Sequence, residues 1–124
     1  MIHDLSRPDV NGVAPKMQAI GDQATVALQG LAPDLHVITN DNLCSSVLIS
    51  GSLDAKETWV NGIFLNSRYF RFSLHASKGR RYYSEGDQVT VEGSAHYSLP
   101  KLRKYTGTPE KCIERIAKWM RENA

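Results

Sequence analysis

Aromatic and basic side chains are interleaved in three short runs of this sequence. All five tyrosines lie between Tyr69 and Tyr105, and four of them stand one or two residues from an arginine or a lysine. The runs are residues 68–72 (RYFRF), 80–83 (RRYY) and 101–105 (KLRKY). Flat aromatic rings stack on bases and cations contact phosphates, so this pattern favours single-stranded nucleic acid as the ligand.

The expected contacts divide into stacking rings and phosphate-binding cations. Tyr69 and one of the adjacent Tyr82 and Tyr83 are the expected stacking residues, because alternation along a strand brings one of that pair onto the face of Tyr69. The alternative is that these rings pack beneath a helix and expose only their hydroxyl groups. The cations expected to contact phosphates are Arg71, Arg80, Arg81, Lys101, Arg103 and Lys104.

Charge is distributed unevenly along the 124 residues. Residues 1–62 hold three cations and seven acidic residues, a net of −4, whereas residues 63–124 hold twelve cations and six acidic residues, a net of +6. Such a split predicts one surface that attracts polyanions. A solvated basic surface without any partner is the alternative.

Signatures of catalysis and of metal binding are missing from the sequence. His3, His36, His75 and His96 lack the close ligand spacing of a zinc site, and no phosphate-binding glycine loop or nucleophile elbow is present. Cys44 and Cys112 fall in apolar segments and are expected to be inert, reduced thiols. We therefore expect neither an enzyme nor a bound metal or cofactor.

The alternation that follows residue 68 is the clearest structural signal. Phe70 and Phe72 fall on one face of a predicted strand, and Tyr69, Arg71 and His75 fall on the other. The apolar face must be the buried one. This alternation places Tyr69, Arg71 and His75 together on an outer face.

The remaining segments predict a single α+β domain over residues 1–124. Residues 1–13 form an irregular lead-in, 14–31 a helix, 35–97 a central antiparallel sheet and 108–123 a second helix, which Thr108 can cap. Strands are expected at 35–38, 46–53, 68–75, 80–83 and 88–97, with a basic loop at 101–107. The segment 59–65 is ambiguous, and residues 61–62 offer a tight turn in its middle. Successive strands with short connections favour a meander, and both helices should cover its apolar face.

Three of these segments resemble strands of bacterial single-stranded-DNA-binding proteins with an OB-fold. They are residues 47–54 (VLISGSLD), 70–76 (FRFSLHA) and 85–94 (EGDQVTVEGS), similar to V-x-L-x-G-x-L, F-x-L-A and K-G-x-x-V-x-V-x-G strands in the same order. The resemblance implies an OB-like sheet and single-stranded DNA as the ligand.

The expected function is that of a small nucleic-acid-binding protein, of a compactness typical of phage or mobile-element proteins. The alternative is a protein-interaction module or inhibitor that docks on an acidic or nucleic-acid-handling partner, because tyrosine and arginine are also enriched at protein–protein interfaces. A second copy of the chain is a further candidate partner through an unprotected edge strand. No apolar run approaches the ~20 residues of a membrane span, and the N-terminus lacks a secretory signal, so a cytoplasmic location is expected.

Overall fold

The computed structural model describes residues 15–40, 46–54, 59–60, 63–64, 68–77, 83 and 86–124, and of residues 15, 16, 40, 59, 60, 63 and 64 the backbone alone. The elements are α1 (Pro15–Leu28), β1 (Asp34–Asn40), β2 (Ser46–Ser52), β3 (Trp59–Val60), β4 (Ile63–Phe64), β5 (Tyr69–Ala76), β6 (Val89–Ala95), β7 (Tyr105–Gly107) and α2 (Pro109–Asn123). The predicted α+β class, with one helix near each end, is confirmed.

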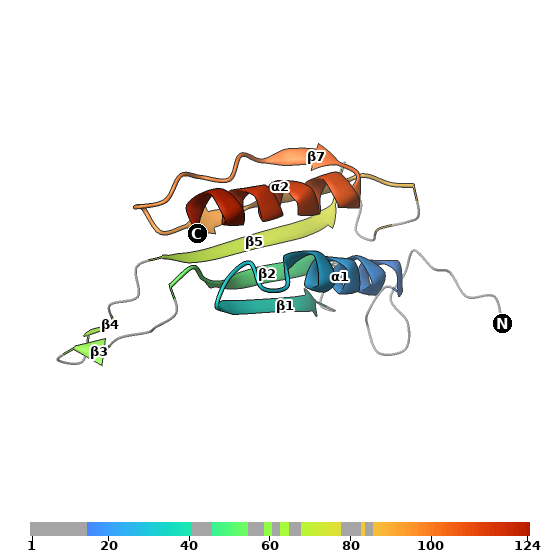
Figure 1. Ribbon diagram of the computed structural model, residues 1–124. Helices are drawn as coiled ribbons and strands as arrows, with labels where there is room; N and C mark the ends of the chain where they lie inside the picture. The colour runs from blue at the N-terminus through green and yellow to red at the C-terminus, as the bar shows by residue number, and fades with distance from the viewer. Residues whose placement is uncertain are drawn as a thin grey trace.

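Five strands form one antiparallel sheet in the order β1-β2-β5-β6-β7. Figure 1 shows α1 and α2 side by side on one face of this sheet. Among the described residues β1 and β7 are not paired with each other, so the sheet is open. The three segments that resemble OB-fold strands contribute to β2, β5 and β6, which are neighbours in the sheet. The other face, which we call the outer face, carries neither helix.

The core lies between the sheet and the two helices. On β5 the apolar residues are buried and the others are at least partly exposed, so the predicted alternation is confirmed. Trp119 of α2 meets Phe70 and Phe72 edge-on, with ring centroids 5.8 and 4.9 Å apart. Such edge-to-face contacts are a favourable arrangement of aromatic rings. Gly21 of α1 permits close helix packing, because a Cβ there would stand 2.5 Å from the Thr39 hydroxyl.

One residue explains the start of α2, and another explains the end of α1. Thr108 caps α2 by accepting the backbone N–H of Lys111 at 3.3 Å, as predicted. Helix α1 ends at Leu28, earlier than the predicted Leu31. Gly30 lies just beyond it with φ at +80°, a left-handed conformation that terminates helices.

One predicted boundary in the sheet was wrong, and one predicted strand lies mostly outside the described residues. Of the predicted strand at residues 80–83 only Tyr83 is described, and it is not part of a strand, while β5 pairs with β2 on one side and with β6 on the other. Residues 105–107 of the predicted basic loop form β7, because they pair with residues 89–91 of β6. The ambiguous segment contains the hairpin β3–β4, whose predicted turn at residues 61–62 lies outside the described residues.

In the described part of the chain, neither helix has the length and apolar character that crossing a membrane would require.

Candidate nucleic-acid interface

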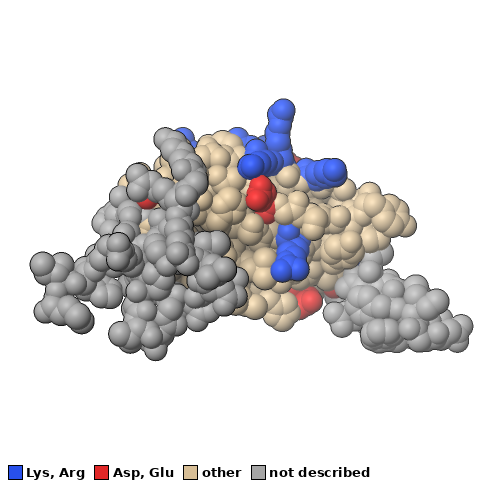
Figure 2. Space-filling model, turned by 180° about the vertical axis from the view of Figure 1, so that it is seen from behind, with Lys and Arg blue, Asp and Glu red and all other residues tan. Residues whose placement is uncertain are grey.

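Tyr69 and Arg71 lie on the outer face, as the sequence predicts. Tyr69 is 49% exposed and Arg71 is also exposed, whereas Phe70 between them is buried beneath the helices. Figure 2 shows the molecule from behind, where lysine and arginine side chains gather along the upper edge and most of the described surface below is uncharged. The outer face therefore offers aromatic and uncharged surface next to a basic border.

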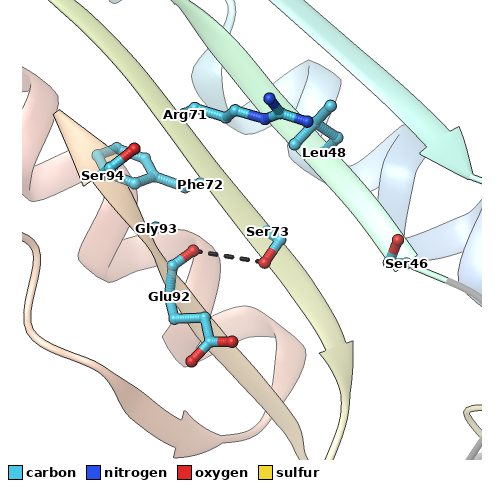
Figure 3. A pocket seen from close by; sticks show the side chains of 8 residues that line it. All are labelled: Ser46, Leu48, Arg71, Phe72, Ser73, Glu92, Gly93 and Ser94. Atoms are coloured by element: carbon cyan, nitrogen blue, oxygen red, sulfur yellow. Dashed lines mark hydrogen bonds between the residues drawn. The ribbon is translucent and has the colours of Figure 1, made fainter.

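A hollow of about 550 Å³ opens on this face across β2, β5 and β6. Four of its lining residues are serine or glycine: Ser46, Ser73, Gly93 and Ser94. Larger side chains at these positions would fill the hollow. Figure 3 shows Arg71 extended over the face toward Leu48, while the Glu92 carboxylate points away from Arg71. The lining residues are Ser46, Leu48, Arg71, Phe72, Ser73, Glu92, Gly93 and Ser94.

Gly93 has a structural role in the hollow. A Cβ at this position would lie 2.1 Å from the backbone oxygen of Arg71 and 2.7 Å from the Cα of Phe72. Any larger residue would therefore force β6 away from β5 at the floor of the hollow.

Glu92 introduces a negative charge that the sequence interpretation did not weigh. Its carboxylate lies 3.2 Å from Nε2 of His75 and 3.5 Å from Nζ of Lys104. Partial desolvation raises the pKa of Glu92, but the hydrogen bond from His75 and the charges of Lys104 and His75 outweigh it and lower that pKa. Lys104 is therefore partly neutralised by Glu92 before any ligand arrives.

This arrangement predicts how the stability conferred by Glu92 varies with pH. Because the folded state lowers the pKa of Glu92, its stabilisation is complete above the pKa of the unfolded chain and is lost as pH falls through the lower folded pKa. We expect Glu92→Gln to lower the melting temperature slightly at neutral pH, since the side chain is 44% exposed, and to have a vanishing effect in acid.

Thermal unfolding of both proteins from pH 7 down to about pH 3 measures the difference. Glu114→Gln, which removes an exposed carboxylate from the middle of α2, is the control. A Glu92→Gln deficit that grows as pH falls would contradict the assigned contacts.

The segment from residue 96 to residue 104 brings the predicted lysines and arginine to the β7 edge. Trp119 of α2 anchors this segment, because its indole Nε1–H donates to the backbone oxygen of Pro100 at 2.9 Å. Lys101, Arg103 and Lys104 are all exposed. Lys104 reaches Glu92, which lines the hollow, so Lys104 lies at the border of the hollow.

An aromatic cluster at one end of the outer face was missed by the sequence interpretation. The His96 ring meets the Tyr69 ring edge-on at 5.6 Å and lies 4.1 Å from the Tyr97 ring, between centroids. The backbone N–H of His96 donates to the backbone oxygen of Tyr69, which holds the cluster together. Tyr97 is 92% exposed. The sequence signal that could have revealed this cluster is the adjacent pair His96 and Tyr97 at the end of the predicted strand 88–97.

The remaining residues predicted to bind are Arg80, Arg81, Tyr82 and Tyr83. Tyr83 is 7% exposed and belongs to the core, so its ring is not available for stacking. Arg80, Arg81 and Tyr82 lie outside the described residues. Arg68 of the first run has a structural role, because it donates to the backbone oxygen of Asn123 and lies 3.6 Å from Asp54.

Reactive groups of other kinds are not assembled in the described ranges. No group of three or more metal-ligating side chains occurs there. Cys112 is buried and its thiol lies 3.4 Å from the backbone oxygen of Val89, and burial raises the pKa of this thiol. Cys44 lies outside the described residues. A buried thiol with a raised pKa is a poor nucleophile.

Comparisons of the chain with protein-family models, with curated proteins and with solved structures gave no match. The outer face itself is the basis for inferring a function.

Proposed function

We propose that the protein binds single-stranded nucleic acid on the outer face of its sheet. The observation that carries this proposal is the exposure of Tyr69 and Arg71 on a sheet face without helices, beside the nearly fully exposed ring of Tyr97. The rings of Tyr69 and Tyr97 are both in contact with His96 and offer adjacent stacking surfaces. Unpaired bases can reach such rings, whereas bases within a duplex cannot.

The charges around these rings fit the same ligand. Arg71 lines the hollow, and Lys104 lies at one border of it, beside the lining residue Glu92. Lys101 and Arg103, three and one residues before Lys104, are also exposed and are the further proposed phosphate contacts. The proposed compartment is the cytoplasm, where a buried free thiol such as Cys112 remains reduced.

Salt dependence provides a test of the cation assignment. Replacing Arg71 with alanine should reduce the slope of log affinity against log salt by about 0.7, the value for one lost phosphate contact on a single strand. Arg121→Ala removes an exposed cation from the last turn of α2 and should leave the slope unchanged. Equal slopes for wild type and Arg71→Ala would remove Arg71 from the site.

The first experiment is fluorescence anisotropy of the protein with labelled oligo-dT and with a matched duplex, at about 50 and about 200 mM salt. Micromolar or tighter binding that prefers the single strand and weakens with salt would support the proposal. Absence of binding to either probe at low salt would exclude it.

A second candidate function is protein binding through the edge strand β1. Among the described residues this seven-residue strand pairs only with β2, and it contains no lysine, arginine or proline to discourage pairing. Ile38 on it is 54% exposed. A second copy of the chain or another protein could add a strand there. Sedimentation of the purified protein and pull-down from a nuclease-treated lysate distinguish these partners, and Ile38→Lys should abolish either complex.

A further inference from the structure

Strand β7 separates two basic surfaces that the chain connects directly. Lys104, just before the strand, reaches the outer face, where its Nζ lies 3.5 Å from the Glu92 carboxylate. The next residue, Tyr105, is opposite the buried Val91 and packs against the core on the helix side. One step along the chain therefore crosses from the outer face to the face that carries α2.

A second hollow, of about 340 Å³, lies on the helix side between β7 and α2. Its lining residues are Tyr105, Lys111, Glu114, Arg115 and Lys118. The guanidinium of Arg115 lies flat over the Tyr105 ring, with its Cζ 3.7 Å from the ring centroid. This cation–π contact fixes the arginine in place and covers one face of the ring. Tyr105 therefore supports Arg115 and does not offer that face to a base.

The cations of this hollow are largely available to a ligand. Lys111, Arg115 and Lys118 are exposed, and they share one side of α2 because they are four and three residues apart. Lys118 has Glu122 at 3.9 Å. Within the described ranges no carboxylate is in ion-pair contact with Lys111 or Arg115. Glu114 is the opposing charge in the hollow.

We propose that this second hollow is a phosphate-binding extension of the interface, and that a bound single strand crosses the β7 edge from Lys104 onto α2. This inference rests on the proposed function. Lys111 and Arg115 are separated by about 6 Å along the helix axis, which is comparable with the spacing of successive phosphates in an extended strand. The contacts are electrostatic, so this part of the interface adds affinity and salt dependence but no base preference.

Oligonucleotide length separates the two parts of the interface. A strand of about 5 nucleotides can occupy the outer face alone, whereas one of about 15 can also cross the β7 edge. We expect Lys111→Ala/Arg115→Ala to bind the short oligo-dT like wild type. With the long oligo-dT, the salt slope of the variant should be smaller than that of wild type by about 1.4, which corresponds to two lost phosphate contacts. The variant should also gain less affinity than wild type when the oligonucleotide is lengthened.

Further variants and outcomes make this test decisive. Lys111→Ala/Lys118→Ala leaves the Arg115–Tyr105 contact intact and should show a similar loss, while circular dichroism verifies that each variant is folded. Glu114→Gln should have the opposite effect and tighten binding of the long strand. Wild type that gains affinity with length, together with variants that gain equally, would overturn the extension but not the proposed function. Failure of wild type to bind either length would overturn both.

Discussion

Replacing Trp119 with alanine is expected to lower the free energy of unfolding by about 3–5 kcal/mol, the usual cost of truncating a buried aromatic side chain. Trp119 is 5% exposed and its ring contacts Phe70 and Phe72 at the centre of the core. Alanine would leave a cavity between α2 and β5 and would also remove the hydrogen bond to Pro100. A domain of this size is stable by only about 5–15 kcal/mol in total.

Denaturation by urea, followed by circular dichroism, measures this loss. Trp119→Phe is the informative companion, because it retains an aromatic ring but lacks the N–H that binds the Pro100 oxygen. We expect it to cost less than the alanine variant. It should also weaken oligonucleotide binding, because the basic segment 101–104 loses its anchor on α2. A loss below about 1 kcal/mol for Trp119→Ala would contradict the central position of this side chain.

The second large effect concerns the aromatic cluster. Tyr97→Ala is expected to lower the affinity for a single-stranded oligonucleotide by about 1–3 kcal/mol, or roughly 5- to 150-fold, which is the cost of losing one stacked base. Tyr97 is 92% exposed, so the substitution should leave thermal stability unchanged. Tyr69→Ala should cause a comparable loss of affinity, although it also removes a contact with the His96 ring.

Phenylalanine variants at the same two positions are the matched controls. Tyr97→Phe and Tyr69→Phe retain the flat ring and should bind nearly as tightly as wild type, because stacking does not need the hydroxyl group. Binding by Tyr97→Ala at wild-type affinity would remove this ring from the interface. An equal loss in the phenylalanine and alanine variants would indicate hydrogen bonding by the hydroxyl and would contradict stacking.

Local sequence patterns are sufficient to predict much of this fold. The two-residue alternation of β5 is sufficient to separate Phe70 and Phe72 from Tyr69 and Arg71, because successive side chains of any strand point to opposite faces. The start of α2 follows equally from the Thr108 cap and from the position of Pro109 in the first turn. These features can be predicted without knowing what β5 or α2 packs against. Once the helices cover the face of Phe70 and Phe72, the exposure of Tyr69 and Arg71 follows.

The composition of the interface depended on which segments pair in space. The run at 80–83 was expected to bring a second tyrosine beside Tyr69, yet β5 pairs with β2 and β6, and Tyr83 is buried in the core. Glu92 contacts Lys104, and His96 contacts the rings of both Tyr69 and Tyr97. The contacts of Glu92 with Lys104 and of His96 with Tyr69 join residues far apart in the sequence, so no local periodicity predicts them. Periodicity determines which way a side chain faces, whereas its neighbours depend on strand pairing, which is set by burial across the whole sheet.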